Sequence, residues 1–333
     1  MIEINIKQSI GITGEAMIGK RGEKPTRQKN TVTNIGLSEI VYSLLDKSAP
    51  AFYFAVGDDD SNITPAQVAL QNALANELER IDTTKTEVFQ DGADLNYIYR
   101  VTGQFGGSPQ SPLNADPAVT LKELGLFNRY VEGEMFARAQ TDAPFTMDSQ
   151  SVYTASWSIK LNAQDIITSG GIVFSGSKLV CDAIMKIDKD VDNVAQYYKG
   201  FGNNTAFTLA PFGLNVVSLG GSGNTITQEA TDLIDPRPAY DTPPTITRLD
   251  LTGEVSDINY EAKIIIQKYI PANSVPFEIK EAGLFNSRQR RAGVETNLIE
   301  TLRTMFSRVV LPVPIAPNAE ATLTWIIGFK RGA

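Results

Sequence analysis

The chain has 333 residues, 42% hydrophobic and 20% charged, which is the composition of a globular protein long enough for two domains of about 150 residues. It has no histidine and a single cysteine, Cys181, which excludes a disulfide framework, a multi-thiolate metal site and the usual general base near neutral pH. The net charge of -8 argues against a surface that grips nucleic acid.

Residues 1–30 form an N-terminal strand and a basic arm. Ile2, Ile4 and Ile6 alternate with polar residues, which predicts a short half-buried strand. An extended basic segment follows, with the side chains Lys20, Arg21, Lys24, Arg27 and Lys29. Two interpretations stay open, a solvated segment or an arm that contacts an acidic neighbour.

Residues 31–162 form the first repeat domain. Apolar residues at helical spacing predict a helix over 37–45, and a capping box at 64–67 predicts a second helix that ends near Arg80. One strand is expected between the two helices, over 52–56. Five more are expected after the second helix, over 86–89, 97–105, 119–126, 134–139 and 152–161.

Residues 163–176 are the predicted linker, and 177–333 form the second repeat domain. A helix is expected over 179–187, and 197–202 resembles the strand and glycine at 52–57. An irregular insertion covers about 203–245, with a short strand at 214–219. Further strands are expected over 246–255, 260–267, 277–284, 304–311 and 321–330.

The two domains are predicted to be related because residues 119–128, V-T-L-K-E-L-G-L-F-N, are repeated at 277–286 as F-E-I-K-E-A-G-L-F-N. Each copy is followed by M-F-x-R and then by a strand with one of the two tryptophans. We expect the tryptophans to be core anchors and the repeated glycines to have positive φ at strand ends. The repeat anchors are Gly125, Phe127, Trp157, Gly283, Phe285 and Trp325.

Two carboxylates repeat as well, Glu123 and Glu281, and a structural role for them is favoured over catalysis. We hypothesise that Arg138 and Arg308, from the two M-F-x-R motifs, are their partners. Residues 287–291 and 297–302 are extra in the second repeat and are expected in an exposed loop. This loop carries a second basic cluster, Arg288, Arg290 and Arg291, which is either solvated or in contact with an acidic subunit.

Motifs for metal or phosphate binding are incomplete. The series Asp188, Asp190 and Asp192 opens like a calcium loop, but Asn193 replaces the turn glycine and Lys199 the last glutamate. Residues 58–62 lack the same features, and the glycines at 220–223 lack the spacing of a phosphate-binding loop. We therefore expect no catalytic, cofactor-binding or metal-binding residues and no cofactor. Cys181 is expected to be a buried apolar side chain.

The element order predicts an α+β fold of two tandem related domains, each with one or two helices and a mainly antiparallel sheet. No apolar run reaches the ~18 residues of a membrane span, and the N-terminus has no secretory pattern. We expect synthesis in a cytoplasm and no membrane or nucleic-acid partner.

The repeated pattern resembles a domain of tailed-bacteriophage structural proteins, particularly tail-fibre, collar and neck-associated components. The resembling motifs are A-V-G-D at 55–58, Thr64-Pro65, the helix end at 73–80, K-E-L-G-L-F-N, M-F-A-R and the tryptophan strand. They cover most of the first repeat and, from Phe277 onward, the last third of the second. The resemblance implies a virion structural protein of the tail, neck or collar, made in the host bacterial cytoplasm.

Such a protein would not be an enzyme, and its partners would be copies of itself and other virion proteins. It would assemble symmetrically or attach fibres. One alternative is a capsid decoration protein. A second alternative, from another class, is a tail enzyme that degrades polysaccharide through carboxylates, which the absence of histidine and of a recognisable carboxylate pair disfavours.

Overall fold

The structure, a computed structural model, describes most of the chain. The described residues are 1–44, 53–59, 77–82, 85–90, 97–106, 118–130, 133–148, 151–163, 170–185, 214–225, 227, 229–251, 260–291 and 299–332. In the first half the elements are β1 (Ile2–Lys20), β2 (Thr26–Val32), α1 (Asn34–Leu44), β3 (Tyr53–Gly57), β4 (Glu77–Asp82), β5 (Lys85–Gln90), β6 (Tyr97–Gly106), β7 (Val119–Phe127), β8 (Met135–Met147) and β9 (Val152–Ala163). In the second half they are β10 (Gly170–Ile172), α3 (Phe174–Met185), β11 (Val216–Gly220), the short 3-10 helix η2 (Pro238–Tyr240), β12 (Ile246–Asp250), β13 (Ala262–Ile270), β14 (Ile279–Arg291), β15 (Ile299–Ile315) and β16 (Ala321–Arg331).

The predicted α+β class is wrong, because the structure is 65% strand and 9% helix, with two α-helices among the described residues. Both helices occur where the apolar spacing placed them, as α1 and α3. The strands are longer than their patterns indicated, with 19 residues in β1 and 17 in β15. Neither described helix is long and apolar enough to cross a membrane.

Strand β4 replaces the expected end of the second helix. Its pairing with β3 shifts register, so that Glu79 lies opposite Val56 and Glu77 opposite Gly57, which leaves Leu78 as an extra residue. Leu78 and Ile81 both pack against the main core. A bulged strand can therefore bury two apolar residues three positions apart, which is the spacing that was interpreted as a helical stripe. The rest of that predicted helix, residues 64–76, lies outside the described residues.

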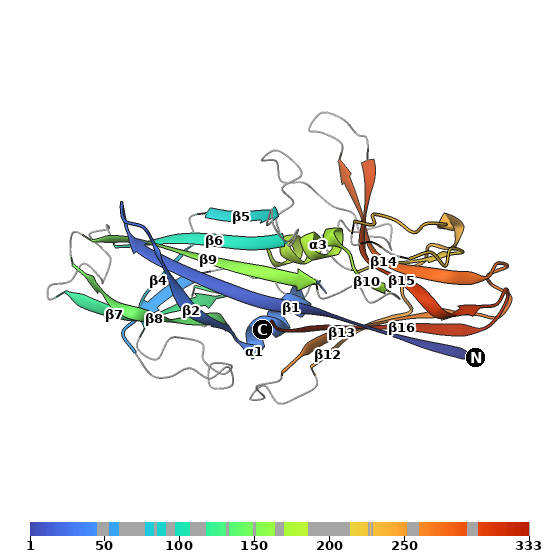
Figure 1. Ribbon diagram of the computed structural model, residues 1–333, viewed down its shortest axis with the longest axis horizontal. Helices are drawn as coiled ribbons and strands as arrows, with labels where there is room; N and C mark the ends of the chain where they lie inside the picture. Colours follow the sequence, from blue (N-terminus) through green and yellow to red (C-terminus); the bar gives the residue numbers. More distant parts are fainter. Residues whose placement is uncertain are drawn as a thin grey trace.

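A central sheet is built around β1, which runs along nearly the whole molecule (Figure 1). From Ile2 to Ile12, β1 pairs in parallel with β16, and from Ile10 to Lys20 it pairs antiparallel with β9. The order across this sheet is β12-β13-β16-β1-β9-β6-β5. Strands of both repeats therefore meet on one N-terminal strand.

Each repeat adds a flanking sheet of its own. The first has the order β2-β8-β7-β3-β4, joined to the central sheet where β2 pairs with β1, and the second has the order β10-β15-β14-β11. The predicted duplication is visible in the pairing, because Val101 lies opposite Trp157 in one repeat and Ile266 opposite Trp325 in the other.

The strand equivalent to β3 is β11, since Ala55 pairs with Gly125 and Ser218 pairs with Gly283. The segment 197–202, which was expected at this position, lies outside the described residues.

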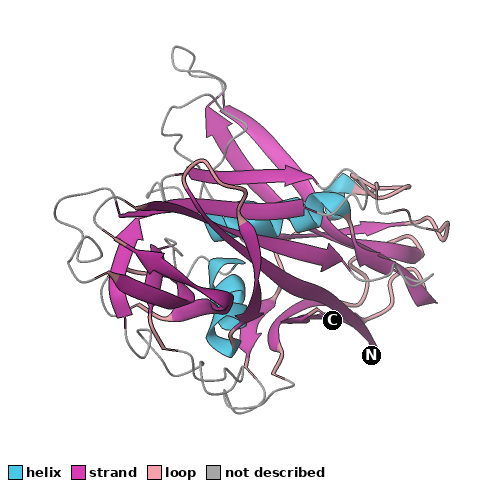
Figure 2. Cartoon of the chain, turned by 60° about the vertical axis from the view of Figure 1, so that its left-hand side comes forward, coloured by secondary structure: helices cyan, strands magenta, loops and turns pink. Residues whose placement is uncertain are grey.

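The helices lie among the strands (Figure 2), and each contacts the sheet of the other repeat. Helix α1 touches β13 and β16, whereas α3 touches β6 and β9. At the start of each helix a glycine packs directly on a strand. A Cβ atom at Gly36 or Gly176 would overlap with the carbonyl oxygen of Phe136 or Phe306, respectively. Each helix also packs on its own repeat, α1 on β8 and α3 on β15, so the two helices lie between the repeats and join them.

The main hydrophobic core joins side chains of β1, of both helices and of both repeats, and two smaller clusters lie around Phe127 and Phe285. Trp157 and Trp325 are fully buried in the main core, which confirms their predicted role as core anchors. The predicted positive φ angles of Gly125 and Gly283 are wrong, because these glycines lie inside β7 and β14 in extended conformation. At Gly283 a Cβ atom would lie 2.8 Å from the Phe285 ring, so this glycine permits close packing instead.

Candidate functional site

The repeated glutamates and arginines form buried ion pairs. Between β7 and β8, Arg138 Nη2 lies 2.5 Å from Glu123 Oε2. Between β14 and β15, Arg308 Nη2 lies 2.5 Å from Glu281 Oε2, and Arg308 Nε donates to the same oxygen at 2.8 Å. All four side chains are buried. The hypothesised pairing is therefore confirmed in both repeats.

Each pair closes the outer face of a flanking sheet. Glu281 accepts backbone N–H groups from Ile234 and Asp235, at 3.2 Å and 2.8 Å, and so ties the segment after β11 to the sheet. In the first repeat Arg138 also contacts Asp59 Oδ2, at 3.3 Å. These carboxylates serve packing, since neither has access to solvent.

The repeated phenylalanines, the remaining sequence anchors, are buried on these outer faces and are each covered by a guanidinium group. Arg80 lies 3.7 Å from the ring centroid of Phe127, and Arg303 lies 3.8 Å from that of Phe285. The arginines come from strands that are not equivalent in the two repeats, β4 and β15. The same contact is therefore made in both repeats by arginines at different sequence positions.

The predicted basic arm is a β-hairpin. Strand β1 continues to Lys20, Gly22 takes a φ of 92° in the turn, and β2 starts at Thr26. The backbone N–H of Arg21 donates to the carbonyl of Val152 at 2.8 Å, which fixes the base of the turn against β9. The tip side chains Arg21, Lys24 and Arg27 are exposed, and Lys20 is half-buried.

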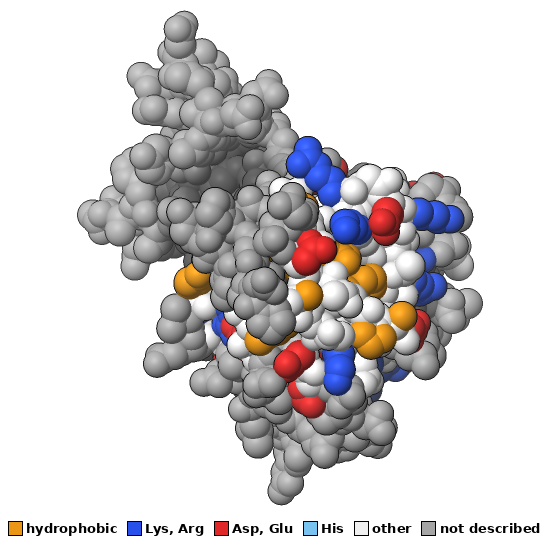
Figure 3. All heavy atoms as spheres, turned by 90° about the vertical axis from the view of Figure 1, so that its left-hand side faces the viewer, with side chains coloured by type: hydrophobic (Ala, Val, Ile, Leu, Met, Phe, Trp, Pro, Cys, Tyr) orange, Lys and Arg blue, Asp and Glu red, His pale blue; other side chains and the backbone are white. Residues whose placement is uncertain are grey.

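Acidic residues moderate the charge of this tip. Arg27 Nε lies 3.5 Å from Glu15 Oε1 across the hairpin, and both side chains are exposed. Figure 3 shows this end of the molecule, where Lys and Arg side chains alternate with Asp and Glu over the visible described surface. Lys29 lies farther along β2, opposite Gln140 of β8.

The second basic cluster also lies on a hairpin rather than in the expected loop. Strand β14 continues through Arg288, Arg290 and Arg291, which pair with Leu302, Glu300 and Ile299 of β15. The extra residues that the structure describes, 287–291 and 299–302, therefore lengthen two paired strands. Figure 1 shows the β1–β2 and β14–β15 hairpins on different parts of the molecule, so the structure does not bring the two basic clusters together.

A carboxyl pair was missed by the sequence reasoning, because its members are 95 positions apart, at 134 and 39. Glu39 is buried on α1, and its side chain is hydrogen-bonded to that of Glu134, next to β8. Glu134 itself keeps an exposed surface. Its partial burial raises the pKa of Glu134, and the hydrogen bond and negative charge of Glu39 raise it further, against the smaller opposing effects of Arg129 and Asn128. No local motif signals this contact.

In the described part of the chain, no three side chains of Asp, Glu, Cys or His gather closely enough to hold a metal ion. The series Asp188 to Asp192 lies outside the described residues, as does residue 60 of the other acidic turn. Cys181 is buried in the core, as expected. No protein-family model, curated protein or solved structure matches the chain.

The carboxyl pair predicts a stability that depends on pH. The pKa of Glu134 is higher in the folded chain than in the unfolded chain, so the folded state binds this proton more tightly. The free energy of unfolding is therefore highest below the unfolded pKa and falls as the pH rises through the folded pKa. Glu134→Gln keeps a hydrogen-bond donor for Glu39, so it should raise the free energy of unfolding at pH 7. Urea unfolding at pH 7 and at pH 4 measures this, and the gain should shrink at the lower pH.

The matched control is Glu278→Gln, which removes an exposed carboxylate whose neighbour is Lys280. We expect it to give no gain at pH 7. A Glu134→Gln variant less stable than the unsubstituted chain at pH 7 would show that the contact between Glu39 and Glu134 does not destabilise the folded chain at that pH.

Proposed function

We propose that this chain is a structural protein of a bacteriophage virion, in the tail, neck or collar region, where it assembles with copies of itself or attaches fibres. The observation that carries the proposal is the β1–β2 hairpin, an exposed basic tip on a chain whose net charge is -8. In a ring of identical copies each interface is heterologous, so a basic tip meets a different, acidic surface of the next copy.

The fold supports this proposal because it gives the tip a rigid base. The first half of β1 is held in the central sheet by β16 and the second half by β9, so the hairpin is continuous with the core. A contact element with a fixed base loses little conformational entropy on binding. The repeated sequence motifs that resemble tailed-phage structural proteins support the assignment to a virion.

The competing proposal of a carboxylate enzyme has weaker support. The two carboxylates that recur in the duplication, Glu123 and Glu281, are fully buried and paired with arginines. A glycoside hydrolase needs carboxyl groups that face a substrate cleft. Assembly through surface charge therefore agrees better with the described geometry.

Reversing the tip charge should weaken self-association. The variant Arg21→Glu with Lys24→Glu should raise the dissociation constant of the oligomer by about tenfold or more, because like charges then face each other across the interface. Light scattering after size-exclusion chromatography measures the mass. The unsubstituted chain should form a defined oligomer at low salt and dissociate at about 0.5 M salt, where exposed charges are screened.

The control variant is Lys263→Glu with Lys280→Glu, which changes the net charge equally but leaves the tip intact. It should assemble like the unsubstituted chain. A monomer at every concentration and salt level would contradict self-assembly. The virion assignment itself is tested by labelling tailed-phage particles with gold-conjugated antibodies to the purified chain, and labelling of the capsid shell alone would favour a decoration protein.

A further inference from the structure

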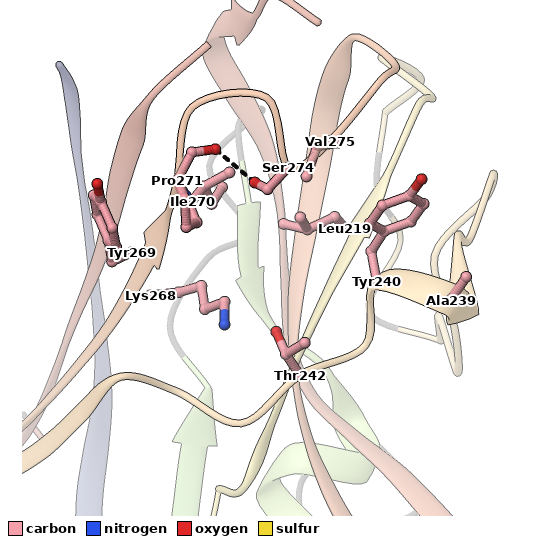
Figure 4. Close-up of a pocket in the computed structure, with 10 residues that line it drawn as sticks. All are labelled: Leu219, Ala239, Tyr240, Thr242, Lys268, Tyr269, Ile270, Pro271, Ser274 and Val275. Atoms are coloured by element: carbon pink, nitrogen blue, oxygen red, sulfur yellow. Dashed lines mark hydrogen bonds between the residues drawn. The ribbon is translucent and has the colours of Figure 1, made fainter. Parts of the chain in front are cut away.

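A pocket of about 170 Å³ lies beside β13 in the second repeat, partly open to solvent (Figure 4). It is bounded by the inner side of β13, the turn after that strand, β11 and the segment around η2. Its apolar wall consists of Leu219, Ile270, Pro271 and Val275, and its polar groups include Lys268, Thr242 and Tyr240.

At the equivalent place in the first repeat, a phenylalanine ring packs directly against the strand. The pairing registers make Gly103 the equivalent of Lys268, and Phe54 the equivalent of the smaller Val217. A Cβ atom at Gly103 would lie 2.6 Å from the Phe54 ring. At these two positions the second repeat thus has a smaller residue on β11 and a lysine on β13.

Lys268 occupies a position that the strand pattern reserves for core residues. Its neighbours on the same face of β13, Ile266 and Ile270, are buried, and burial lowers the pKa of Lys268. The ammonium donates to the carbonyl oxygen of Pro243 at 3.2 Å, and no second hydrogen bond to it is found among the described residues. Two of its three N–H donors are therefore available to a ligand.

Thr242 supplies a second polar group. Its Oγ1 atom is buried and has no hydrogen-bond partner within the described part of the chain, although buried hydroxyls normally have one. Lys268 and Thr242 both line the pocket, and in the view of Figure 4 the Thr242 hydroxyl is turned toward the side of the Lys268 ammonium. The nearby Tyr269 hydroxyl is not available, because it donates to Glu320 at 2.8 Å.

We propose that this pocket binds a small carboxylate with a compact apolar tail. The carboxylate accepts hydrogen bonds from the Lys268 ammonium and the Thr242 hydroxyl, while Leu219, Ile270 and Val275 surround the tail. The volume suits a group of about six non-hydrogen atoms, because a cavity of about 150 Å³ holds benzene. Two sources have this chemistry, a free short-chain acid and the C-terminal residue of a partner protein with an apolar side chain.

Calorimetric titration of the full-length chain with isovalerate tests the proposal, with isovaleramide as the uncharged ligand of the same shape. We expect isovalerate to bind with a dissociation constant on the order of 1 mM, which is within the bound for so few atoms, and the amide to bind at least tenfold more weakly. A second titration compares the peptide Gly-Gly-Val with its C-terminal amide. Tighter binding of the free-carboxylate peptide than of isovalerate identifies a chain terminus as the ligand, whereas binding of isovalerate alone identifies a free acid.

Substitutions assign the binding to this pocket. Lys268→Met keeps the length of the side chain without its charge and should raise the dissociation constant at least tenfold, and Thr242→Val should raise it several-fold. Lys263→Met, on the opposite face of β13, should leave binding unchanged. The proposal is overturned if neither carboxylate binds, or if the Lys268 and Thr242 variants, shown to be folded by circular dichroism, bind as well as the unsubstituted chain.

Discussion

Replacing Arg308 with methionine should cost about 3–5 kcal/mol of the free energy of unfolding, because the substitution leaves the buried Glu281 carboxylate without its cation. Glu281 would retain two backbone N–H donors, from Ile234 and Asp235, which are too few to replace the guanidinium charge. Urea unfolding followed by tryptophan fluorescence measures the loss. Arg138→Met, in the equivalent pair of the first repeat, should have an effect of similar size.

The double variant Glu281→Met with Arg308→Met should recover only part of this loss. A buried ion pair can often be replaced by apolar side chains at little cost, but the backbone N–H groups of Ile234 and Asp235 lose their acceptor. The matched control is Arg237→Met, because Arg237 pairs with Asp235 at the surface, with both side chains more than 40% exposed. That change should cost at most about 1 kcal/mol. An Arg308→Met variant no less stable than Arg237→Met would contradict the structural role of the buried pair.

Trp325→Ala should lower the free energy of unfolding by about 3–5 kcal/mol, because it leaves a cavity in the core. Trp325→Phe should cost clearly less, since the indole N–H of Trp325 has no hydrogen-bond partner in the described residues and no such bond is lost. Trp157 has the same burial and the same unpartnered N–H, so its two variants form a matched pair.

Thermal unfolding monitored by circular dichroism measures these differences. A Trp325→Phe variant as unstable as Trp325→Ala would show that the indole N–H makes a contribution that the geometry does not reveal. If Trp→Ala costs less than about 1 kcal/mol at either position, the tryptophans are not the core anchors that their burial indicates.

The features that could be predicted from sequence are those with a local or a repeated signal. Apolar residues at helical spacing located both described helices, and alternation located most strands. The ion pairs were accessible because duplication gave Glu123 and Glu281, and their arginines, the same relative positions. A pattern that occurs twice in one chain restricts the interpretations more than either copy alone.

The fold class was predicted wrongly because the deciding contacts are long-range. Nothing local in residues 1–20 shows that one strand will join the sheets of both repeats, and the two apolar residues of β4 have a spacing that fits a helix equally well. Gly36 and Gly176 are needed because a helix lies directly on a strand a hundred residues away, and the sequence gives no sign of this contact.

The missed site features have the same cause. Glu39 and Glu134 meet only because α1 packs beside β8. Lys268 lies just beyond the expected strand 260–267, and its register with β16 places it on the inner face, opposite Leu323. Comparison of this position with Gly103 of the first repeat was possible only when the pairing of both sheets was known.

Differential scanning calorimetry of the full-length chain tests most directly the central claim, that two repeats form one interwoven unit around β1. Helices that pack on both repeats and a shared core predict a single cooperative transition, which Trp325→Ala and Trp157→Ala should each shift as a whole. The predicted domain 31–162, produced alone, should then fail to show a cooperative transition. Two separate transitions in the full-length chain, each sensitive to only one of the tryptophans, would contradict the account.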